Sequence, residues 1–300
     1  MQLSINKIVI LLFVLNLLVP TDSAQQGTQN SWSVGSLAYD AGHWTMTNEW
    51  IFEVFVVDPQ HPKPKSLTLG SKPEWSPDGK KIVFCYFEKG RKPELYTIDP
   101  DGSDRKQLTR AKGGTGACSP SWSPDGSKIA YSAQDGSHWA VWVVNSDGTG
   151  SQRITEGQEP RWSPDGKRLA FFRSRGGAGT KSTVWTVNMD GSQATQIGEE
   201  GFVSWEPSWT ADGRVLFASN REGKSAIYIA QPDGTNLRQF AHSAAYDLFA
   251  PVLSPDGKLL VVDAVAGHNG SEILLVDLGG QNKPQQLATG THPSVRWVRQ

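Results

Sequence analysis

The stretch Pro73-Glu-Trp75-Ser-Pro-Asp78-Gly79 decides the fold, because it recurs along the chain. Its copies share an opening proline, a large apolar residue two positions later and a closing Asp-Gly pair, and they begin at Pro120, Pro160, Pro207 and Pro251. A shortened sixth copy begins at Pro293. Neighbouring prolines are 40 to 47 residues apart. A period in this range indicates stacked supersecondary units, so the repeat sets the architecture.

Each copy predicts four short strands. In the first, residues 73–75, 81–84, 94–98 and 106–109 are rich in branched and aromatic residues. The first and second strands are joined by one Asp-Gly turn and the third and fourth by another, which suits hairpins because glycine adopts positive φ without strain. Four strands in about 40 to 45 residues make one blade of a β-propeller.

The two ends of the chain are predicted to share a blade. Strands are expected at 36–39, 52–57 and 66–69, but no Pro-x-Trp opening precedes them. Residues 293–297 supply that missing strand. We therefore predict an all-β, six-bladed β-propeller over residues 31–300, a single domain closed by pairing its N- and C-terminal segments, which removes open sheet edges. The alternative is that residues 31–33 form a first strand of their own.

Composition excludes one class of partner. The 300 residues are 37% hydrophobic and 20% charged, and the net charge is −1. A nucleic-acid-binding protein neutralises phosphates with clustered lysine and arginine, and no such cluster is present. We expect no nucleic-acid partner.

The first 24 residues have the pattern of a signal peptide. Lys7 precedes an apolar run of about 12 residues, too short for a membrane span, and small polar residues follow up to Ala24. Cleavage after Ser23 or Ala24 is expected, and an uncleaved anchor is the alternative. The rest of the chain is therefore expected to be periplasmic or secreted, without a stable membrane span. Export also permits a disulfide between the two cysteines, Cys85 and Cys118, which we place on one side of a single blade; two buried free thiols are the alternative.

The Trp-Ser-Pro-Asp-Gly openings, each followed by Lys-x-Ile or a similar strand, resemble the propeller repeats of the TolB-like family, a periplasmic component of the Tol-Pal system. The resemblance covers residues 73–300 strongly and 31–72 weakly. It implies a six-bladed propeller that docks to envelope proteins such as the peptidoglycan-associated lipoprotein and TolA. TolB carries an α/β domain before its propeller, and the roughly 30 residues available here are too few for one. Similar repeats build the propellers of oligopeptidases, the tricorn protease and oligogalacturonate lyases.

Most prominent residues are better explained by structure than by chemistry. The tryptophans of the repeat, Trp75, Trp122, Trp162 and Trp209, are expected to fill the seams between blades rather than bind sugar, since large aromatics dominate core packing. The sequence contains no nucleophile-elbow, zincin or Cys-x-x-Cys motif. We therefore assign no catalytic residue, no metal and no cofactor.

One face of the propeller is the candidate binding surface. The Asp-Gly turns lie on one side, here named the turn face, and the remaining, more variable connections lie on the other, the loop face. Loops on a rigid scaffold are where binding usually resides. The candidate binding residues on the loop face are Glu159, Arg161, Trp205, Glu206, Tyr246 and Asp247.

The predicted function is an exported, monomeric, non-catalytic binding module for a protein of the cell envelope. The alternatives are a carbohydrate-active lyase or hydrolase, and an accessory propeller for a peptidase.

Overall fold

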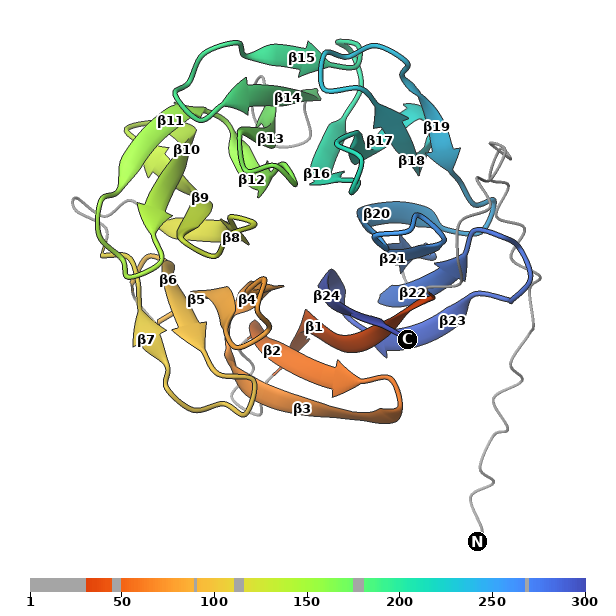
Figure 1. Ribbon diagram of the computed structural model, residues 1–300, viewed down its shortest axis with the longest axis horizontal. Helices are drawn as coiled ribbons and strands as arrows, with labels where there is room; N and C mark the ends of the chain where they lie inside the picture. The colour runs from red at the N-terminus through yellow and green to blue at the C-terminus, as the bar shows by residue number, and fades with distance from the viewer. Residues whose placement is uncertain (1–30, 45–49, 89–90, 111–115, 175–180, 268–269) are drawn as a thin grey trace, which may run out of the picture.

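The computed structural model describes residues 31–44, 50–88, 91–110, 116–174, 181–267 and 270–300. In these residues the chain forms six four-stranded antiparallel sheets arranged as a ring around a central channel (Figure 1). The predicted all-β, six-bladed propeller is confirmed. None of the described segments forms a helix that could cross a membrane. The predicted signal peptide, residues 1–24, lies outside the described part of the chain.

The blades share one strand order from the channel outward. Blade 1 contains β24 (Thr291–Arg299), β1 (Trp32–Trp44), β2 (Trp50–Asp58) and β3 (His61–Leu69), and blade 2 contains β4 (Ser71–Trp75), β5 (Ile82–Tyr86), β6 (Glu94–Ile98) and β7 (Lys106–Gln107). Blade 3 contains β8 (Ala117–Trp122), β9 (Lys128–Asp135), β10 (His138–Asn145) and β11 (Gln152–Glu156), and blade 4 contains β12 (Gln158–Trp162), β13 (Arg168–Ser174), β14 (Ser182–Asn188) and β15 (Thr195–Ile197). Blade 5 contains β16 (Ser204–Trp209), β17 (Val215–Glu222), β18 (Lys224–Ala230) and β19 (Arg238–Ala241), and blade 6 contains β20 (Asp247–Leu253), β21 (Leu259–Val265), β22 (Ser271–Asp277) and β23 (Gln285–Thr289).

The repeated phrase forms a tight turn held by its own side chains. In blade 2, the Ser76 hydroxyl donates to the Asp78 carboxylate at 2.7 Å and accepts from the backbone N–H of Lys81 at 2.9 Å. Gly79 has φ 69°, which favours glycine, and its N–H donates to the Ser76 carbonyl at 2.8 Å. The phrase therefore turns the innermost strand back into the second one.

The ring closes as the sequence predicts. β24 lies beside β1, with Leu37 opposite Val295 and Ala38 opposite Ser294 (Figure 1). β1 begins already at Trp32, which lies opposite Arg299. Residues 32 and 33 therefore extend β1 and do not form a separate first strand.

The repeat tryptophans fill the seams between blades. Trp75, Trp122 and Trp162 are buried, and Trp209 is half-buried. Each packs against the preceding blade; Trp162, for example, contacts a cluster containing Ala130 and Val141 of blade 3. The prediction of seam packing is confirmed.

The predicted disulfide is present, although its position differs from the expected one. Cys85 on β5 is bonded to Cys118, and their Cα atoms are 5.0 Å apart. Cys118 belongs to β8, because that strand begins before the repeat proline, at Ala117. The expectation that both cysteines belong to one blade was therefore wrong, since the bond joins blades 2 and 3.

A candidate binding site in the central channel

The residue before each repeat proline has the same unusual backbone conformation. These six residues have φ between 43° and 53°, and they are Lys72, Ser119, Glu159, Glu206, Ala250 and His292. None is glycine, although left-handed backbone costs other residues roughly 1–2 kcal/mol each. The innermost strands shift register at this point, as in a β-bulge, which re-aims a side chain. These six residues, here named the channel ring, lie near the start of each innermost strand, at the loop-face end of the channel.

Two members of the ring form an ion pair across the channel. The Lys72 ammonium of blade 2 contacts the Glu159 carboxylate of blade 4, and the two side chains are 20% and 13% exposed. Burial would raise the pKa of Glu159, but the charge and hydrogen bond of Lys72 outweigh burial and lower it. The Glu159 carboxylate is therefore ionised at neutral pH, and both side chains have little contact with water.

A second network links the closing strand β24 to β1 of its own blade and to blade 5. His292 Nδ1 lies 2.9 Å from Asp40 Oδ1, and His292 Nε2 lies 3.8 Å from Glu206 Oε1. Burial would lower the pKa of His292, but the Asp40 carboxylate outweighs it and the pKa is raised. Burial, followed by the charge of Glu159, raises the pKa of Glu206. The imidazole is thus held between two carboxyl groups.

Asp263 adds a further buried carboxyl group behind the ring. It lies on β21, is 5% exposed, and its Oδ1 has no hydrogen-bond partner among the described residues. Burial, followed by the charge of Glu206, raises its pKa to about 7. Asp40 is fully buried and its Oδ2 also lacks a partner in the described part of the chain. This end of the channel therefore concentrates acidic groups that are poorly compensated.

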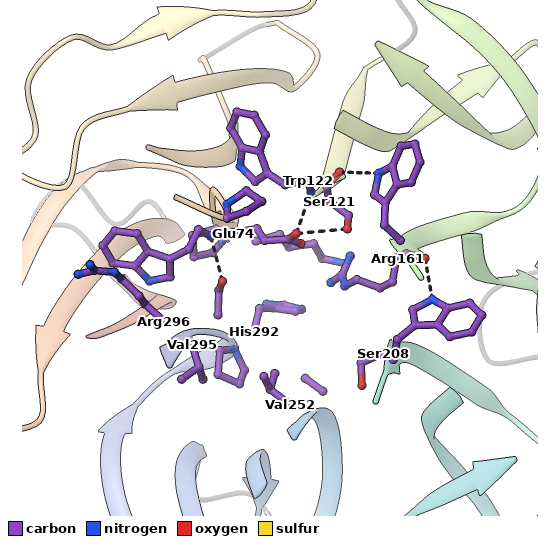
Figure 2. A pocket seen from close by; sticks show the side chains of 18 of the residues that line it. Glu74, Ser121, Trp122, Arg161, Ser208, Val252, His292, Val295 and Arg296 are labelled. Atoms are coloured by element: carbon purple, nitrogen blue, oxygen red, sulfur yellow. Dashed lines mark hydrogen bonds between the residues drawn. The ribbon is translucent and has the colours of Figure 1, made fainter. Parts of the chain in front are cut away.

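Four members of the ring, Lys72, Glu206, Ala250 and His292, help to line a cavity of about 400 Å³. Figure 2 shows Glu74 and Arg161 extending into it from two blades. Glu74 accepts hydrogen bonds from the backbone N–H of Trp122 at 2.8 Å and from the Ser121 hydroxyl at 3.2 Å. Burial raises the pKa of Glu74, and the nearby Arg161 opposes this. Arg161 Nη1 donates to the Pro160 carbonyl at 3.0 Å.

Three of the six predicted residues lie at the channel. Glu159 and Glu206 belong to the channel ring, and Arg161 lines the cavity. The Trp205 ring, next in sequence to Glu206, stacks on Phe249 of blade 6 at 5.6 Å.

Tyr246 and Asp247 lie apart from the ring, at the start of β20. Tyr246 packs against the core between blades 5 and 6, and Asp247 Oδ1 accepts from the Ser225 N–H at 2.6 Å. Both residues therefore help to hold blades 5 and 6 together, in addition to any role in binding.

The sequence reasoning missed five residues of the site, Asp40, Lys72, Glu74, Asp263 and His292. A signal for Lys72 and His292 was available, because both precede a repeat proline, as Glu159 and Glu206 do. A signal for Asp263 was also available, since it is the charged residue in the otherwise apolar segment 259–265. The described residues contain no group of three or more histidine, cysteine or acidic side chains that could hold a metal ion.

Comparison with known proteins identifies the repeat. The family model of the TolB beta propeller domain matches residues 64–177 and 156–295. A TolB homolog of Chlorobium luteolum is 38% identical over 77 residues, which are 25% of this chain and 17% of that protein.

Solved structures share the fold. TolB of Acinetobacter baumannii superposes with a TM-score of 0.67 at 22% identity, covering 87% of this chain and 66% of that one. A putative TolB of Agrobacterium tumefaciens gives 0.65 at 19% identity, covering 89% and 99%. Because the family model spans most of the described residues, the chain belongs to the TolB β-propeller family.

Proposed function

We propose that this chain is an exported, non-catalytic binding protein that holds a protein partner at the loop-face end of its channel. One observation carries the proposal, namely the channel ring. Six strained backbone positions and a set of buried charged side chains lie there. Strain and buried charge of this kind concentrate at functional sites.

The partner we infer is a protein of the cell envelope, such as a peptidoglycan-associated lipoprotein. Membership of the TolB β-propeller family supports this inference. A periplasmic location agrees with the sequence of the first 24 residues. Arg161 and Glu206 both line the cavity, so a polar side chain of a partner would meet a guanidinium and a carboxyl group there.

The experiment measures binding of a purified peptidoglycan-associated lipoprotein by calorimetry. Arg161→Gln should weaken binding about tenfold or more, because a buried charged contact is worth ~2 kcal/mol or more. Lys167→Gln removes the same charge on the turn face, where Lys167 is exposed, and should bind as wild type does. Equal affinities for Arg161→Gln and wild type, with both proteins folded, would refute the channel as the binding site.

A second candidate function is supported by the pair formed by Asp40 and His292. A carboxylate that orients an imidazole inside a cavity is an arrangement used for general acid–base catalysis. A lyase or hydrolase acting on an acidic polysaccharide would use it at the channel mouth. Cleavage of oligogalacturonides that is lost in His292→Gln would establish this function in place of simple binding.

A further inference from the structure

Three seams between blades contain the same arrangement, in which an arginine covers aromatic rings. In blade 4, the guanidinium carbon of Arg173 lies 4.3 Å from the Trp185 ring and 5.2 Å from the Phe171 ring. Arg173 also crosses the seam, because its Nη2 donates to Thr155 Oγ1 of blade 3 at 2.9 Å. The guanidinium therefore fills the space between the rings of one blade and the outer strand of the preceding blade.

The seams before blades 2 and 5 repeat this arrangement. Arg105 lies 4.8 Å from the Tyr86 ring and 5.7 Å from the Tyr96 ring, and its Nη1 donates to Thr68 Oγ1 of blade 1 at 3.3 Å. Arg221 lies 4.6 Å from the Tyr228 ring. A guanidinium suits this space because it is planar, stacks on aromatic faces and is weakly hydrated.

The seam between blades 2 and 3 has the two sides of this arrangement without the arginine. Tyr131 on β9 lies opposite Trp142 on β10, as Phe171 lies opposite Trp185 in blade 4. Thr109 of blade 2 corresponds to Thr155 of blade 3. Thr109 follows Leu108 just after β7, and Thr155 follows Ile154 on β11. Among the described residues, no lysine or arginine lies over the Trp142 ring.

A cavity of about 540 Å³ occupies this place. Its inner wall is aliphatic and aromatic, formed by Leu108, Ala117, Tyr131, Ala133, Trp142 and Val144. On the blade 2 side of this seam β7 has two residues, whereas β11 of blade 3 has five.

The polar lining of the cavity favours a cation. Among the described residues, the carboxylates of Glu94 and Asp147 and the guanidinium of Arg110 line it. Glu94 Oε2 accepts from Thr109 Oγ1 at 2.5 Å, which fixes the carboxylate at the blade 2 wall. Burial raises the pKa of Tyr131, and the charge of Glu94 adds to it, so this carboxylate acts on the aromatic wall.

We propose that this cavity binds a guanidinium group on a short aliphatic stem, placed over the Trp142 ring and facing the Glu94 carboxylate. The stem would lie along Leu108 and Val144, as the apolar part of an arginine does on other surfaces. The guanidinium belongs either to a free small molecule or to an arginine of a bound peptide. This site is separate from the channel, and its test does not depend on the proposed function.

The experiment titrates the full chain with n-butylguanidine, and in parallel with the peptide acetyl-Gly-Arg-Gly-amide, by calorimetry and by NMR of the indole N–H signals. Saturable binding of butylguanidine is expected, with pentanamide as an uncharged control that does not bind. Trp142→Leu should weaken binding about tenfold, as loss of a partly desolvated cation–π contact does. Trp185→Leu, the matched change in the seam that Arg173 already fills, should leave it unchanged. Tighter binding of the peptide than of butylguanidine assigns the guanidinium to a partner chain, and the reverse order assigns it to a free ligand.

A second variant tests the site by filling it. Ala133 follows Tyr131 by two residues, as Arg173 follows Phe171, and it lines the cavity. Ala133→Arg should therefore place a guanidinium over Trp142, raise the melting temperature and abolish binding of both probes. The proposal is overturned if neither probe binds saturably to wild type, or if folded Ala133→Arg binds them as well as wild type does.

Discussion

The change Asp263→Asn should remove most of an unusual dependence of stability on pH. The carboxyl group of Asp263 is 5% exposed and its pKa is raised to about 7 by burial and by the charge of Glu206. In the unfolded chain an aspartate has a pKa of about 3.9. Between these values the folded protein holds a proton that the unfolded chain releases. The stability from this proton is complete at low pH and is lost as pH rises through about 7.

The size of the effect follows from the two pKa values. Lowering the pH from 8 to 5 should stabilise the wild-type protein by about 2 to 3 kcal/mol through Asp263 alone. His292 and Glu206 act in the same direction, because their pKa values are also raised in the folded protein. Aspartates of the turn face, such as Asp125, act in the opposite direction, but they do so nearer pH 2 to 4, below this window.

The assay is urea unfolding at pH 5 and pH 8 at constant ionic strength, followed by tryptophan fluorescence. Asp263→Asn should be more stable than wild type at pH 8, and it should lose most of the gain that wild type shows on acidification. Glu199→Gln, which changes an exposed carboxylate, should keep the wild-type dependence. Equal unfolding free energies of wild type at the two pH values, or an unchanged pH dependence in Asp263→Asn, would refute the reasoning.

Three further predictions concern the fold. Trp162→Ala should lower the free energy of unfolding by ~3 to 5 kcal/mol, because it opens a seam and leaves the Ser121 carbonyl without its indole donor. Trp205→Ala removes a half-buried stacked ring and should lower it by about 1 kcal/mol. Urea titrations of the two variants measure the difference. Deletion of 291–300 removes β24 and should replace one cooperative thermal transition with a broad one, and an unchanged melting curve would contradict closure by this strand. Replacement of Cys85 and Cys118 by alanine should lower the free energy of unfolding by ~3 to 4 kcal/mol, since the disulfide closes a loop with a sequence separation of 33. Non-reduced mass spectrometry of the wild-type protein is the control. Two free thiols in that protein would contradict the prediction.

The fold could be predicted from the sequence because the repeated phrase marks both the innermost strand of each blade and the turn that follows it. Pro73 and Gly79 mark the two ends of one phrase, and the same spacing at Pro293 located the strand that closes the ring. Local chemistry is enough for such predictions, because the serine, aspartate and glycine of the turn contact one another within a few residues.

The channel was only partly readable, because its residues meet across the ring. Lys72 and Glu159 are 87 residues apart in the chain and lie on blades 2 and 4. Such a pair follows from the angular positions of blades, which the repeat period does not specify. Asp40 and His292 are 252 residues apart and meet within the closing blade, where the contact depends on the register of β1 against β24. Tyr246 and Asp247 were proposed for binding because they lie in a variable connection. Their packing and hydrogen bonding became visible only once β18 and β20 were placed side by side.

In the channel ring, the backbone conformation is constant and the side chain varies. The bulge before each proline is the same in every blade, yet the residue that occupies it is lysine, serine, glutamate, alanine or histidine. Each position can therefore change its chemistry by a single substitution without a new loop or a new strand. Six such positions, one on each innermost strand, give this scaffold a way to acquire new specificities in small steps while its blades stay unaltered.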